Sequence, residues 1–275
     1  MQSILTKLEL ADFEFLLGII RSPVGFTSDG KLRTALDDLA HATDSTSYRE
    51  KLCVLLEQEI RYLGSSDVAY LFRKIVKARG GPGVPFRELV TDVSRKLKLA
   101  DQPRLCTDEE LLERLVQAYT SARMRALPVE EQRALLEDAG MSAQDVRSFL
   151  RGGAARFAIP ALIQVAGIPV AQKLITNAVI GTVSAYIGRE AAKTLIGQLA
   201  ARFPLWGQWL GPIAWGVSGL WTAYDLQGPA TRKTIPITLY LGLCMLRDGG
   251  YDEGDAEQAV PAERQQPASP PVAAR

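Results

Sequence analysis

The sequence predicts an all-α protein in which a charged, multi-helix N-terminal half precedes a hydrophobic helical hairpin rich in glycine and tryptophan. Apolar residues in the first half recur at helical spacing, and no alternating strand pattern stands out. Charge is unevenly distributed, with only eight charged residues between positions 157 and 246. Residues 203–224 form an uncharged run of 22 residues that holds all four tryptophans. These three features separate a polar helical part from a strongly apolar one.

Residues 1–45 are predicted to form an N-terminal helical module. Two short helices flank the turn sequence SPVGFTSDG, and Leu32, Leu36 and Leu39 share one face of the second helix. The sequence GFTSDGKL resembles part of a phosphate-binding loop, but Leu32 stands where such a loop supplies a hydroxyl to Mg²⁺. We therefore expect an ordinary turn followed by a helix.

Residues 46–152 are predicted to form an amphipathic helical domain. Residues 48–78 contain two helical patterns separated at the sequence GSS, and residues 86–97 place apolar side chains on one face of a third helix. Three further helices are expected: one begins after a capping-box sequence, one has a proline in its first turn, and one begins after a serine cap. The residues that give these start signals are Thr107, Pro128 and Ser142.

Residues 153–247 are predicted to form a hydrophobic helical module rich in glycine, proline and tryptophan. As a helix, the 203–224 run is long enough to cross a bilayer core of roughly 30 Å, but Gly211 and Pro212 interrupt it. Residues 234–246 form a second uncharged stretch, so the two stretches predict a hairpin. A tightly packed core in a soluble protein is the alternative. Residues 248–275 are polar and rich in proline, alanine and glutamine, which is typical of disorder.

No combination of residues indicates catalysis, and we therefore expect a non-enzymatic protein with no cofactor, metal site or small-molecule substrate. His41 is the only histidine, and it is expected to contact helix carbonyls or solvent. The three cysteines lack metal-ligand or disulfide spacing, which fits a reducing, cytoplasmic location. A net charge of +1 gives no indication of nucleic-acid binding. The N-terminal sequence lacks the pattern of a signal peptide.

Two sequence blocks resemble the YaaW family of bacterial proteins. The sequences GPIAW (211–215) and LWTAYDLQGPATRKTIPIT (220–238) are similar to the family signature GPIGW…DxxGPAYRVTIPA, from which Ala214, Thr231 and Lys233 depart. The sequences EIR, AYLFR, GVPFREL and KLKL between residues 59 and 99 resemble its middle region, and DGKLR resembles its N-terminal module. The resemblance implies little about mechanism. A link between this family and ubiquinol–cytochrome c chaperones implies an assembly factor.

The resemblance and the apolar pattern together define the candidate residues for membrane contact or helix packing. They are Gly207, Gly211, Pro212, Trp215, Trp221, Tyr224, Asp225, Gly228, Pro229, Arg232, Ile235 and Pro236. The preferred function is a cytoplasmic protein whose hydrophobic module associates with the inner membrane or inserts into it conditionally. The alternative is a soluble chaperone or assembly factor that binds a partner protein through a helical groove.

Overall fold

The computed structural model describes residues 1–20, 29–41, 45–64, 83–99, 106–152, 157–187 and 229–249. Within these ranges 86% of the residues are helical and no strand occurs, which confirms an all-α fold. The helices are α1 (Gln2–Leu5), α2 (Leu10–Ile20), α3 (Asp29–His41), α4 (Ser45–Leu63), α6 (Phe86–Lys96), α7 (Asp108–Ala126), α8 (Val129–Asp138), α9 (Ala143–Arg151), α10 (Ile159–Ala166), α11 (Ile168–Ile187) and α15 (Pro229–Gly249).

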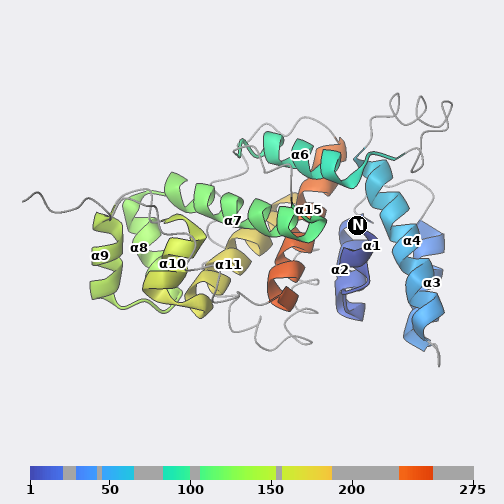
Figure 1. The fold of residues 1–275 in the computed structure, drawn as a ribbon, viewed down its shortest axis with the longest axis horizontal. Coiled ribbons are helices and arrows are strands. Elements are labelled where there is room, and N and C mark those ends of the chain that lie inside the picture. The colour runs from blue at the N-terminus through green and yellow to red at the C-terminus, as the bar shows by residue number, and fades with distance from the viewer. Residues whose placement is uncertain are drawn as a thin grey trace, which may run out of the picture.

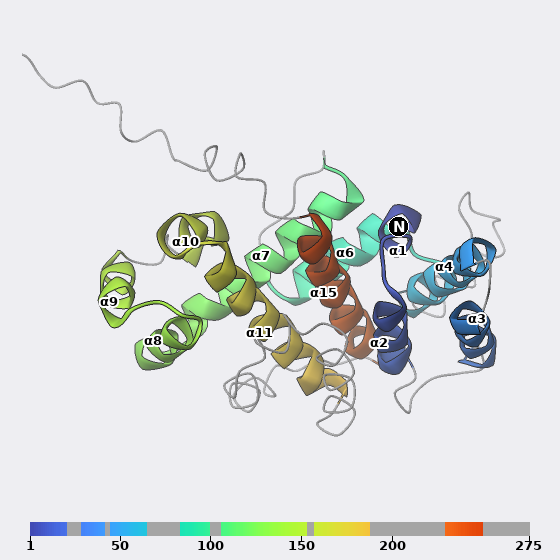
Figure 2. The same cartoon turned by 90° about the horizontal axis from the view of Figure 1, so that it is seen from below.

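Helix α15 lies in the middle of the molecule (Figure 1). The view from below places α3 and α4 at one end of the molecule, and α8, α9 and α10 at the other (Figure 2). Between these ends, α15 packs against α2, α4, α6, α7 and α11. A helix from the predicted hydrophobic module is therefore enclosed by α2, α4, α6 and α7 from the predicted N-terminal half, together with α11 of its own module.

The buried apolar side chains of these helices form one continuous cluster. It includes Phe13 of α2, Leu56 of α4, Leu112 of α7 and Tyr240 of α15, all of which are fully buried. Burying a large apolar side chain stabilises a fold by about 1.5–3 kcal/mol, so this shared cluster joins the two predicted parts. The domain boundaries placed after residues 45, 152 and 247 remain predictions.

Several helix ends follow from local sequence signals. Thr107 accepts a hydrogen bond from the Glu110 amide at 3.1 Å, while the Glu110 carboxylate accepts one from the Thr107 amide at 2.8 Å. This reciprocal pair is the predicted capping box. Ser142 caps α9 in a similar way, and His41 Nδ1 lies 2.8 Å from the Asp37 carbonyl oxygen, as expected. Pro128 is the N-cap of α8, one position before the first turn in which it was predicted.

Candidate functional site

Four of the predicted site residues lie on α15, namely Pro229, Arg232, Ile235 and Pro236. Pro229 is the first residue of the helix, where a missing amide hydrogen is tolerated. Ile235 and Pro236 are buried inside it. The remaining eight predicted residues lie outside the described ranges: Gly207, Gly211, Pro212, Trp215, Trp221, Tyr224, Asp225 and Gly228.

Residues 234–246, the predicted second arm of the hairpin, are buried in the helical core. Every side chain from Lys233 to Leu246 is buried. A helix that is apolar on all sides requires neighbours on all sides, and α15 has them in α2, α4, α6, α7 and α11. None of the helices in the described ranges combines the length and apolarity that crossing a membrane requires. The apolar pattern of residues 234–246 is thus explained by burial among other helices.

An ion pair joins Arg247, near the end of this helix, to the buried Asp12 of α2. The guanidinium donates two hydrogen bonds, from Nη1 to Oδ1 at 3.0 Å and from Nη2 to Oδ2 at 2.8 Å. The side chain of Asp12 is fully buried, and that of Arg247 is 14% exposed. A two-pronged arginine–carboxylate contact fixes both distance and orientation. It therefore holds the end of α15 against the beginning of α2.

Two further side chains complete the Asp12 cluster, defined as Asp12, Tyr240, Cys244 and Arg247. The Tyr240 hydroxyl donates to Asp12 Oδ1 at 2.7 Å, and the Cys244 thiol donates to the same oxygen at 3.6 Å. The backbone amide of Glu9 donates to Oδ2 at 2.8 Å, so the carboxylate also caps the start of α2. A buried carboxylate needs such donors, because each unsatisfied lone pair would raise the cost of its burial.

Tyr240 links this polar cluster to the apolar core. Its ring stacks on Phe15 of α2 with centroids 4.1 Å apart and an interplanar angle of 29°. Burial raises the pKa of the Tyr240 hydroxyl well above its ordinary value, and the neighbouring Cys244 and Asp12 add to that increase. The hydroxyl therefore stays protonated and continues to donate to Asp12. This arrangement suits a structural contact between α2 and α15.

A second buried cation holds the opposite end of the same helix pair. The Lys233 ammonium near the start of α15 donates to the carbonyl oxygen of Ile20, the last residue of α2. A positive charge at a helix C-terminus is favourable because the final carbonyl groups lack partners within the helix. Since Lys233 meets the end of α2 and Arg247 meets its beginning, α2 and α15 run antiparallel.

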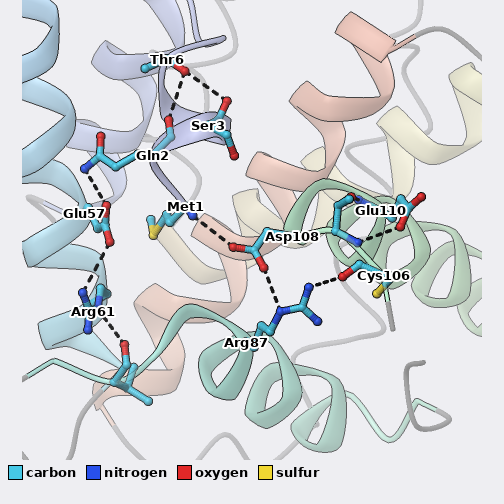
Figure 3. Close-up of polar contacts among 12 residues, drawn as sticks. Met1, Gln2, Ser3, Thr6, Glu57, Arg61, Arg87, Cys106, Asp108 and Glu110 are labelled. Carbon is cyan, nitrogen blue, oxygen red and sulfur yellow. Dashed lines mark hydrogen bonds and ion pairs between the residues drawn. The ribbon is translucent and has the colours of Figure 1, made fainter. Parts of the chain in front are cut away.

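Another polar network joins α1, α4, α6 and α7 (Figure 3). Asp108 Oδ1 lies 3.0 Å from Arg87 Nε, and Asp108 Oδ2 lies 3.1 Å from the amino group of Met1. On the α4 side, Glu57 accepts a hydrogen bond from Gln2 at 2.6 Å. No group of histidine, cysteine and acidic residues that could hold a metal ion occurs within the described residues. The network connects four helices of the fold.

The Asp12 cluster was not predicted from the sequence. Asp12 was interpretable only as an acid in the first turn of a helix, and Arg247 as the cation that ends an uncharged stretch. The two residues are 235 positions apart, so no local spacing connects them. The available signal was the placement of two acidic residues, Asp12 and Glu14, among the apolar residues of the α2 sequence, LADFEFLLGII.

In the part of the chain that the structure describes, the fold defines an all-helical class of protein built around a buried helix, α15. The chain is 26% identical over 229 residues to a "UPF0174 protein" of Helicobacter pylori strain J99, which covers 79% of this chain and 78% of the relative. It is 24% identical over 232 residues to a "UPF0174 protein" of strain 26695, covering 77% of this chain and 97% of the relative.

These relatives support membership of a bacterial family whose name assigns no activity, while the YaaW-like assignment is not confirmed. No family model matches the chain. No solved structure matches it either.

Proposed function

We propose that this protein is non-enzymatic and that its uncharged run, residues 203–224, associates with the surface of a membrane. The proposal assigns this role to only one arm of the predicted hairpin, because residues 234–246 are buried in the helical core. The run has no charged side chain and holds all four tryptophans. Tryptophan favours the membrane interface, where one edge of its ring is apolar and the other can bind water.

The packing of α11 against α15 carries the proposal, because it restricts how the intervening chain can meet a bilayer. Helix α11 ends at Ile187, α15 begins at Pro229, and the two helices pack directly against each other. The chain between them therefore starts and ends on the same side of any membrane. A single crossing would separate α11 from α15, so the connection must return to the side from which it came.

A return across the bilayer within this connection would be costly. Residues 188–202 contain Arg189, Glu190, Lys193 and Arg202, and each charge near the bilayer centre costs about 2.5–3.5 kcal/mol on insertion scales. Gly211 and Pro212 also interrupt the 203–224 run near its middle. Shallow or re-entrant association satisfies these constraints, whereas a straight span does not.

Intrinsic fluorescence tests the proposal directly, because the only tryptophans of the chain are in this run. The full chain is mixed with vesicles of phosphatidylethanolamine and phosphatidylglycerol. We expect a blue shift of the tryptophan emission and sedimentation of the protein with the vesicles. Ile213→Asp places a charge in the run without removing a tryptophan, and it should weaken vesicle binding at least about tenfold.

The matched control is Val165→Asp, which introduces the same charge at a side chain of α10 that is 49% exposed. It should leave vesicle binding unchanged. Wild-type emission and sedimentation that do not respond to vesicles would contradict membrane association. If a defined protein instead co-purifies with the wild type and is lost with Ile213→Asp, the chaperone or assembly function is supported in place of membrane association. A nucleotide or metal bound stoichiometrically to the purified chain would contradict the non-enzymatic assignment.

A further inference from the structure

We draw no further inference here: the strongest candidate, the face of α4 on which Tyr48, Val54 and Tyr62 are exposed, lies at one end of the molecule (Figure 2), but nothing in the described residues shows what covers it.

Discussion

Gly242 of α15 lies directly against the backbone of Leu112 on α7. A Cβ atom added to Gly242 would stand 2.8 Å from the carbonyl oxygen of Leu112 and 2.4 Å from Cγ2 of Val116. A backbone carbonyl inside a helix cannot move aside as the end of a long side chain can. The absence of a side chain at Gly242 therefore sets how closely the central helix approaches α7.

Gly242→Ala should lower the free energy of unfolding by about 1–3 kcal/mol, because the added methyl group forces α15 and α7 apart. Urea denaturation followed by far-UV circular dichroism measures the change. Gly30→Ala is the matched control, since a Cβ at this exposed position on α3 meets nothing within 4 Å. It should stabilise the protein by up to about 1 kcal/mol. If the urea midpoint of Gly242→Ala equals that of the wild type, the contact between Gly242 and α7 is not tight enough to exclude a methyl group.

Neutralising either member of the Asp12–Arg247 pair should be strongly destabilising. Asp12→Asn or Arg247→Met alone should lower the free energy of unfolding by about 3–5 kcal/mol, because each leaves a buried charge without its partner. The double variant should lose much less than the sum of the two single losses. Equilibrium denaturation of all four proteins gives the coupling energy.

The exposed Arg95–Asp92 pair, with its nitrogen and oxygen 2.7 Å apart, is the control for that cycle. Arg95→Met should change stability by less than about 1 kcal/mol because both side chains are more than half exposed. If the double variant instead loses as much stability as the two single variants together, Asp12 and Arg247 are not energetically coupled despite the short distances between them.

Stability should fall as the pH rises above about 10, the ordinary pKa of a tyrosine hydroxyl. Burial raises the pKa of Tyr240, Tyr119 and Tyr186 above that value in the folded protein. Between the unfolded and folded pKa values, the unfolded chain has released protons that the folded chain retains, so the free energy of unfolding decreases with pH. Denaturation midpoints measured from pH 8 to pH 11 record the decrease.

Tyr240→Phe removes one of these groups and should make the alkaline loss of stability less steep. The substitution also removes the hydrogen bond to Asp12, so the variant should be less stable than the wild type at pH 8. Tyr48→Phe is the control, because Tyr48 is 41% exposed on α4. If the free energy of unfolding of Tyr240→Phe falls with pH as steeply as that of the wild type, Tyr240 does not retain its proton in the folded protein as assigned.

The sequence predicted those parts of the fold that depend on neighbouring residues. The Thr107 capping box requires only Glu110 three positions later, and the Ser142 cap requires only the next turn of helix. The helices on either side of residues 21–28 likewise follow from the periodicity of their own apolar residues. Such signals are short-range, so one sequence contains all the information that they need.

The position of α15 could not be predicted in the same way. Burial among other helices and burial in lipid both select uncharged, apolar residues, so the pattern of residues 234–246 fits either environment. The Asp12–Arg247 pair would have decided between them, but it joins residues that are 235 positions apart. The role of Gly242 depends on the same long-range packing, because its neighbour on α7 is known only when the helices are placed together.

The ion pair between Asp12 and Arg247 also bears on how the chain folds during synthesis. At about 5–20 residues per second, the ribosome takes roughly 12–47 s to add the 235 residues that separate them. During that interval α2 lacks both the counterion of its buried acid and the apolar surface of α15. The core around α2 can therefore be completed only after α15, the last helix of the described residues, has been synthesised.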